Sequence, residues 1–189
     1  KAEAIMSSVA AGMVPLFHEK DIRDMGGADT RYYNYADVAC MRNLEANDIA
    51  AMGTDLSGSV WGMAEYNLIT VFGEHDDKVP PYWYLCWDNI TAANKLLDNL
   101  PMSTVGDNKK LKQYRAMGLV TRAYFYNYLM ENFQQAYMLD GQANYDNKLG
   151  MMLYTSFDPQ QPYKARASAA ETYDSILKWS KEAVTLMKE

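Results

Sequence analysis

The sequence lacks the features that place a chain in a membrane or on a nucleic acid. No uninterrupted apolar run reaches the roughly 18 residues that a bilayer-spanning helix needs, and the most apolar stretch, residues 7–17, contains Gly12 and Pro15. The 18 basic residues are outnumbered by 24 acidic ones and form no cluster, which leaves a net charge of −6. Because phosphate binding needs a basic surface, this balance argues against a nucleic-acid partner.

Cysteine and histidine are also scarce, with two of each in 189 residues. Cys40 and Cys86 lie in helix-like stretches, where we expect buried free thiols rather than a disulfide. His18 follows a helix-like segment and His75 lies in an acidic loop, and neither has the base and orienting group of a nucleophilic site nearby in sequence. We therefore expect a protein that is not an enzyme, although a pair of glycosidase-type carboxylates stays open because their separation is a three-dimensional property.

Metal-binding patterns are equally weak. Asp21, Asp24 and Asp29 surround a Gly26-Gly27 pair, but their order is not that of an EF-hand loop. The sequence thus predicts no metal and no cofactor, with structural calcium at this cluster as the one option.

Helical periodicity is what the sequence does contain. Apolar residues recur at three- and four-residue steps in five segments, which are 3–17, 32–46, 82–100, 108–133 and 169–188. The last begins with a capping-box pattern, Ser168 to Glu171, and no stop signal ends it, so we expect residues 1–189 to be the N-terminal helical region of a longer protein. Its predicted apolar stripe comprises Tyr173, Ile176, Leu177, Ser180, Ala183, Val184 and Met187.

Two long gaps separate these helices, at about residues 47–81 and 136–167. The strand-like run at 68–72 stands alone, so the fold class is mainly α, built of antiparallel helix pairs with long loops. Both gaps are rich in aromatic residues, which a disordered linker avoids, and we expect them to be ordered and to carry the binding function. The aromatics of the second gap are Tyr137, Tyr145, Tyr154, Phe157 and Tyr163.

Trp61 is the leading candidate for contact with a ligand. It lies between glycines in the first gap and is followed by Tyr66 and Asn67. An indole ring stacks on the apolar face of a sugar, while amide and carboxylate groups bond its hydroxyls. The alternative is that Trp61 fills a small core of its own loop.

Several segments together resemble the SusD/RagB family of outer-membrane lipoproteins. They are Asn47-Asp48, the helix 87–94 (Trp-Asp-Asn-Ile-Thr-Ala-Ala-Asn), the run 122–129 (Arg-Ala-Tyr-Phe-Tyr-Asn-Tyr-Leu) and the segment 163–176. Three segments depart from the family pattern: Phe133-Gln134 replaces Phe-Gly, residues 151–153 (Met-Met-Leu) replace Val-Pro-Leu, and Trp179-Ser180 replaces Asp-Leu.

The resemblance implies a tetratricopeptide-like, SusD-like helical fold and a role in nutrient capture. Such proteins lie on the cell surface at the outer membrane, held by a lipidated N-terminal cysteine that would precede this chain, and they cover a TonB-dependent SusC-like transporter. They bind glycans, or in RagB-like members peptides. On this basis we expect Trp61, Tyr66, Asn67 and Asp48 to contact a glycan, with peptide capture or a helix-repeat interaction scaffold as the alternatives.

Overall fold

The computed structural model of the chain describes residues 79–134, 138–139, 142–143 and 148–188. The described residues from Cys86 onward belong to one compact unit. The helices expected at 3–17 and 32–46, the strand-like run at 68–72, Cys40 and the possible calcium cluster all lie outside the described residues.

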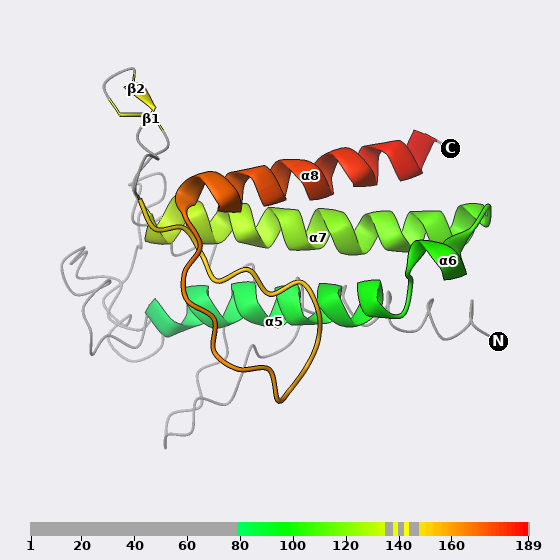
Figure 1. Cartoon of the computed structure of the whole chain (residues 1–189), viewed down its shortest axis with the longest axis horizontal. Coiled ribbons are helices and arrows are strands. Elements are labelled where there is room, and N and C mark those ends of the chain that lie inside the picture. The colour runs from blue at the N-terminus through cyan, green and yellow to red at the C-terminus, as the bar shows by residue number, and fades with distance from the viewer. Residues whose placement is uncertain (1–78, 135–137, 140–141, 144–147, 189) are drawn as a thin grey trace, which may run out of the picture. The chain divides into compact units, whose positions relative to one another are not determined.

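Four helices and a small hairpin make up the described part of the chain (Figure 1). The helices are α5 (Val79–Asp98), α6 (Met102–Val105), α7 (Lys109–Phe133) and α8 (Ala169–Lys188). The strands β1 (Met138–Leu139) and β2 (Gln142–Ala143) pair antiparallel, with Met138 opposite Ala143. Figure 1 shows α7 between α5 and α8 and antiparallel to both. The predicted mainly α fold is therefore confirmed, while α6 and the hairpin were not predicted.

Local signals explain the turn between α5 and α7. Pro101 cannot continue α5 and instead precedes α6, which ends at Gly106 with a positive φ of 49°. Asn108 then caps α7, because its side-chain oxygen accepts hydrogen bonds from the backbone N–H groups of Lys110 (3.0 Å) and Leu111 (3.2 Å). Under this turn lies a buried cluster of Ala93, Leu96, Leu100, Val105 and Leu111.

Close approach of α5 and α7 depends on Gly118. A Cβ at this position would lie 3.0 Å from Cγ of Leu97 and 3.3 Å from Cδ2 of Leu96. The glycine lowers the helix propensity of α7 but lets the leucines of α5 pack against its backbone.

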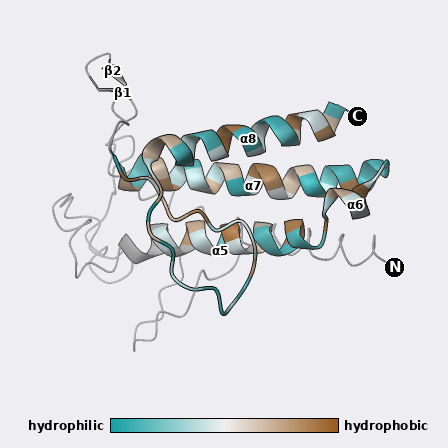
Figure 2. Cartoon of the chain, viewed as in Figure 1, coloured by the Kyte–Doolittle hydropathy of each residue, from teal (hydrophilic) through white to brown (hydrophobic). Residues whose placement is uncertain are grey.

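The face of α8 that packs on α7 differs from the predicted stripe. The buried residues of α8 are Ala169, Thr172, Ile176, Trp179, Ala183 and Leu186. Leu177, Val184 and Met187 belong to the predicted stripe but are exposed by 53%, 52% and 63%, so that part of the prediction is wrong. Figure 2 shows hydrophobic and hydrophilic residues mixed along the ribbons of α7 and α8. Leu177, Val184 and Met187 thus form a second apolar row of α8, one position after the buried Ile176, Ala183 and Leu186.

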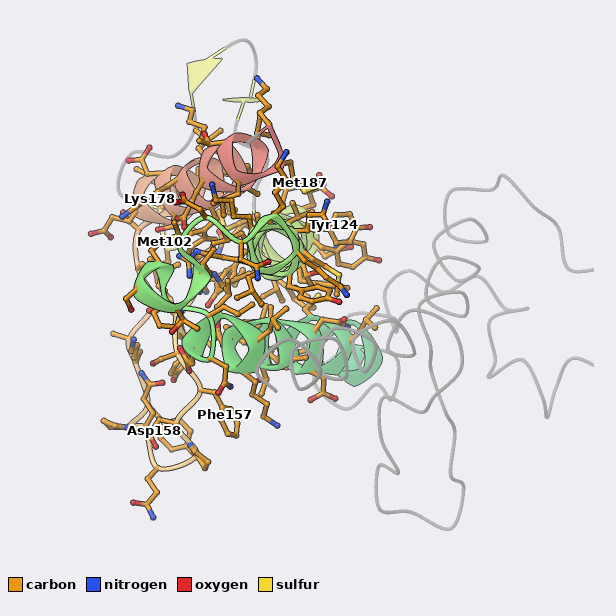
Figure 3. All side chains as sticks on the ribbon, turned by 90° about the vertical axis from the view of Figure 1, so that its right-hand side faces the viewer. Met102, Tyr124, Phe157, Asp158, Lys178 and Met187 are labelled. Carbon is orange, nitrogen blue, oxygen red and sulfur yellow. The ribbon has the colours of Figure 1, made fainter. Side chains whose placement is uncertain are left out.

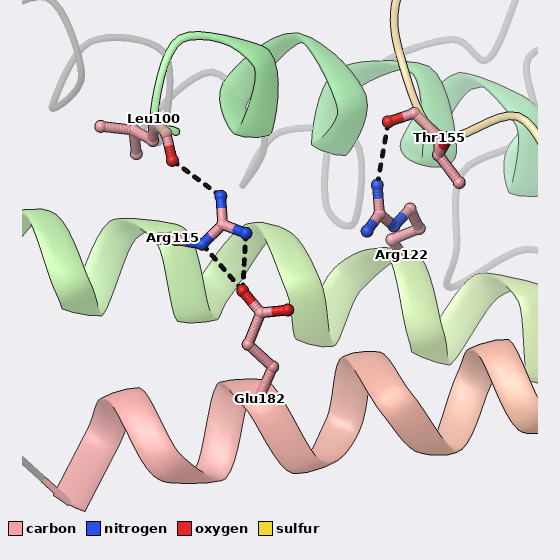
Figure 4. A network of polar contacts seen from close by, with 5 residues as sticks. All are labelled: Leu100, Arg115, Arg122, Thr155 and Glu182. Carbon is pink, nitrogen blue, oxygen red and sulfur yellow. Dashed lines mark hydrogen bonds and ion pairs between the residues drawn. The ribbon is translucent and has the colours of Figure 1, made fainter. Parts of the chain in front are cut away.

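Arg115 of α7 bonds both to α8 and to the segment that follows α5 (Figure 4). Its Nε and Nη2 atoms donate to Oε1 of Glu182 on α8, at 2.9 and 2.6 Å, and its Nη1 atom donates to the carbonyl oxygen of Leu100 at 2.7 Å. Because the pair is partly buried and the guanidinium uses three donors, this contact orders the bundle more than an isolated surface ion pair would.

Candidate ligand-binding site

Residues 148–168, here called the strap, return the chain from the hairpin to α8. The two ends of the strap pair antiparallel. The N–H of Gly150 donates to the carbonyl of Ala167 at 2.6 Å, the N–H of Ala167 donates to the carbonyl of Met151 at 3.0 Å, and Leu149 and Ser168 form a β-bridge. Between these ends the strap extends along α5 (Figure 1). The expectation that the second gap is ordered is thus confirmed for residues 148–167.

Three buried side chains of α5 and α7 hold the strap in place through hydrogen bonds. The amide of Asn94 donates to the carbonyl of Tyr154 at 2.9 Å. Arg122 donates through Nη1 to Oδ1 of Asn94 and to the carbonyl of Thr155, both at 3.2 Å (Figure 4). The hydroxyl of Tyr126 donates to the carbonyl of Met152 at 2.9 Å and accepts from the N–H of Tyr154 at 2.8 Å.

Burial sets the charge state of these anchors. Arg122 is only 6% exposed, and desolvation lowers its pKa to about 10, so the guanidinium still carries its charge at neutral pH. It is stabilised by the ring of Trp179, 4.3 Å from its central carbon. Desolvation raises the pKa of Tyr126, so its hydroxyl stays neutral and able to donate. The Arg-Ala-aromatic run of α7 therefore serves to anchor the strap.

A pocket of about 370 Å³ lies between α5 and the strap. Four aromatic rings line it: Trp87 from α5, and Tyr154, Phe157 and Tyr163 from the strap. Trp87 is half-buried and held by edge-to-face contacts with Tyr126 and Tyr154, at ring-centroid distances of 5.8 and 5.7 Å. Phe157 is 41% exposed and Tyr163 is fully exposed, so these two rings are open to a ligand.

Polar groups complete the lining of this pocket. The side chains of Thr91, Ser156 and Gln161 form no hydrogen bond within the described part of the chain, which leaves two hydroxyls and one amide available. Asp158 is the one ionisable side chain among the described lining residues apart from tyrosines, and its Oδ1 atom accepts from the N–H of Gln160 at 2.9 Å. Figure 3 shows Phe157 and Asp158 on the side of α5 that faces away from α8.

The sequence-based candidates divide between described and undescribed regions. Trp61, Tyr66, Asn67 and Asp48 lie outside the described residues, so they stay predictions. Three aromatics of the second gap, Tyr154, Phe157 and Tyr163, are brought together in the pocket. Trp87 lies in the predicted helix 82–100, and periodicity did not show that it borders a pocket.

Three further predictions concern a cysteine, metal binding and the membrane. Cys86 is a buried free thiol as expected, and desolvation raises its pKa. In the ranges that the structure describes, no group of three or more His, Cys, Asp or Glu side chains is arranged to hold a metal ion. None of the described helices combines the length and apolarity required to cross a membrane.

Comparisons with known proteins point to one family. A profile of SusD-like proteins, described as starch-binding and associating with the outer membrane, matches residues 3–189. No significant sequence match was found among curated proteins. A crystal structure of a SusD superfamily protein from Bacteroides thetaiotaomicron has a similar fold, with a TM-score of 0.62 and 17% identity over 97% of this chain. The alignment spans only 37% of that protein. Since the profile match extends over nearly every residue, the chain belongs to the SusD-like family.

Proposed function

We propose that this protein binds glycans at the outer membrane without altering them. The observation that carries the proposal is the match of the SusD-like family, described as starch-binding and associating with the outer membrane, to residues 3–189. Because the chain aligns with little more than a third of the similar solved structure, the proposal concerns the protein to which this region belongs.

The geometry of the described residues supports a binding role. Three long helices form a frame, and buried hydrogen bonds from Asn94, Arg122 and Tyr126 hold the strap on it. Aromatic rings and unpaired hydroxyls then face a pocket, a combination suited to a ligand with both apolar faces and hydroxyl groups. Glycoside hydrolysis normally uses two carboxyl groups, whereas Asp158 is the one carboxylate among the described lining residues.

In the proposed mechanism, several weak contacts act together. We expect Trp61 and Tyr66 to stack on sugar rings, and Asn67 and Asp48 to bond sugar hydroxyls. Each contact contributes modestly, so a long polymer is held better than a monomer. We further propose that the protein is anchored at the cell surface by an N-terminal lipid and passes its ligand to a SusC-like TonB-dependent transporter.

The experiment uses the full-length protein and native electrophoresis in gels that contain starch or other polysaccharides. Migration should be retarded by at least one polysaccharide, and Trp61→Ala should reduce the retardation. Tyr124→Ala is the matched control, because Tyr124 is an exposed aromatic on α7 that does not line the pocket. If no polysaccharide retards the full-length protein, the proposal is wrong.

Peptides and the transporter need separate measurements. Isothermal titration with oligosaccharides and with mixed peptides distinguishes glycan capture from peptide capture, and a protein that binds only peptides contradicts the glycan proposal. Affinity purification from its native outer membrane should bring down a β-barrel protein. Purification without such a barrel contradicts the transporter partnership but not glycan binding.

A further inference from the structure

We infer that the pocket between α5 and the strap is a subsite for one neutral sugar ring. This inference rests on the proposed function and adds to it a place and a chemical class of ligand. Its support comes from the shape, the unpaired groups and the charge of the pocket.

The size and the rings of the pocket suit a single sugar unit. A volume of about 370 Å³ lies near the lower end of the range for small-ligand pockets, about 300–1,000 Å³. Trp87 and Tyr154 are half-buried and held in place, and the Tyr154 hydroxyl accepts from the N–H of Lys164 at 3.0 Å. Phe157 and Tyr163 are exposed on the strap, so aromatic residues of both α5 and the strap border the pocket.

The hydrogen-bonding groups available there match sugar hydroxyls. Thr91, Ser156 and Gln161 present donors and acceptors that have no partner in the described part of the chain. A sugar hydroxyl is itself both donor and acceptor, so it can bond to any of these three side chains without leaving an unsatisfied group.

Part of the strap backbone that an added peptide strand would use is already bonded within the chain. The N–H groups of Tyr154, Phe157 and Lys164 donate to Tyr126 OH, Asp98 Oδ2 and Tyr154 OH. Those of Gln160 and Gln161 donate to the side chain and the carbonyl of Asp158. Peptides that add to a strand edge rely on such donors being free.

The charges around the pocket favour a neutral ligand over an anionic one. Asp158 lines the pocket, and the carboxylate of Asp98 lies against the strap where it accepts from Phe157 at 2.6 Å. Two lysines each lie beside a ring of the pocket, Lys95 at Phe157 and Lys164 at Tyr154, but neither is among the lining residues. Nζ of Lys95 sits 4.3 Å from the centre of the Phe157 ring, and Nζ of Lys164 donates to the carbonyl of Leu153 at 2.9 Å. The carboxylate of a bound uronic acid would lie near that of Asp158 and be repelled by it. No lysine is among the described lining residues to offset this repulsion.

Titration of the full-length protein tests the subsite. Neutral malto-, cello-, xylo- and manno-oligosaccharides are compared with oligogalacturonate at low salt. Tyr163→Ala and Gln161→Ala should each weaken binding of the neutral ligand by about fivefold, as the loss of one ring contact or one hydrogen bond predicts. Tyr124→Ala should leave it unchanged. Asp158→Asn should lower the ratio of the affinity for neutral oligosaccharides to that for acidic ones, because it removes the carboxylate from the pocket.

A signal from within the pocket distinguishes binding there from an indirect effect of the substitutions on affinity. With 5-fluorotryptophan incorporated, the fluorine resonance of Trp87, assigned with Trp87→Phe, should shift on addition of the neutral oligosaccharide. If the protein binds glycans while this resonance and the affinities of the Tyr163 and Gln161 variants stay unchanged, the subsite is wrong and the proposed function stands. Equal affinity for oligogalacturonate, unaltered by Asp158→Asn, overturns the neutral specificity. Binding of no oligosaccharide at all removes the proposed function, and the subsite with it.

Discussion

Gly150 lies where the strap begins, against the first turn of α8. Its N–H donates to the carbonyl of Ala167, and its own carbonyl accepts from Nε of Arg166 at 2.7 Å. A Cβ at this position would lie 2.5 Å from the carbonyl oxygen of Ser168 and closer still to Oγ1 of Thr172. The absence of a side chain is therefore what allows the strap to contact α8 here.

Substitution of Gly150 tests this contact. Gly150→Ala should lower the free energy of unfolding by about 2 kcal/mol, because the methyl group overlaps backbone atoms that cannot move aside cheaply. Urea denaturation followed by circular dichroism measures the change. Leu149→Ala is the control, since its side chain is exposed by 56%. Similar stability in both variants would show that the strap adjusts at no cost.

The Ser168–Glu171 capping box makes the start of α8 sensitive to pH. The backbone N–H of Ser168 donates to Oε2 of Glu171 at 2.9 Å and its hydroxyl donates to the same oxygen at 2.8 Å, and these bonds lower the pKa of Glu171 below its usual value of 4.5. The ionised form stabilises the fold, so its contribution is present above pH 4.5 and lost as the pH falls through the lowered pKa. The Tm of the parent protein should exceed that of Glu171→Gln at pH 7, and the difference should shrink at pH 3. A Tm difference between the two proteins that does not vary with pH contradicts this assignment.

At the scale of elements, α8 has two apolar rows one residue apart. Trp179 belongs to the buried row, where its ring lies 5.2 Å from that of Tyr126 and under the guanidinium of Arg122. Leu177, in the other row, is exposed by 53%. Because the two rows differ little in hydrophobicity, the contacts of Trp179 decide which row is buried.

Matched truncations distinguish the two rows. Trp179→Ala should lower the free energy of unfolding by about 3–5 kcal/mol, because it removes a buried ring and its contact with a buried cation. Leu177→Ala should change it by less than about 0.5 kcal/mol. Equal losses in urea denaturation would mean that both rows are buried.

At the scale of the molecule, the pocket depends on groups that do not line it. One wall comes from α5 and the other from the strap, and Tyr126 on α7 fixes their relation by bonding to Met152 and Tyr154. Removing its hydroxyl leaves a backbone carbonyl and an N–H without that partner in a partly buried place.

The variant Tyr126→Phe should therefore loosen the strap. We expect a loss of about 1–3 kcal/mol in stability and faster tryptic cleavage after Lys164 and Arg166, which lie on the strap. Tyr114→Phe is the control, because the hydroxyl of Tyr114 makes no hydrogen bond within the described ranges. Cleavage rates that match the parent protein would show that the strap is held without Tyr126.

Local interactions explain how much of this fold was predictable. The two helices at 108–133 and 169–188 were predicted to within one residue, because Asn108 and the Ser168–Glu171 box mark their starts through contacts only two or three residues long. The predicted helix 82–100 starts at Val79 and ends at Asp98, as helix ends generally vary by a few residues. α6 and the hairpin were missed because four residues or fewer carry no periodic signal.

The sequence alone determined the helical class, the principal helix starts and the family, since each depends on neighbouring residues or on ordered short motifs. Tertiary structure decided which row of α8 is buried, and it placed Arg122 inside as an anchor for the strap. It also brought Trp87 and Tyr163 to the same pocket. These outcomes depend on contacts between residues tens of positions apart, and hydrophobic periodicity records only which residues share a face, not what that face meets.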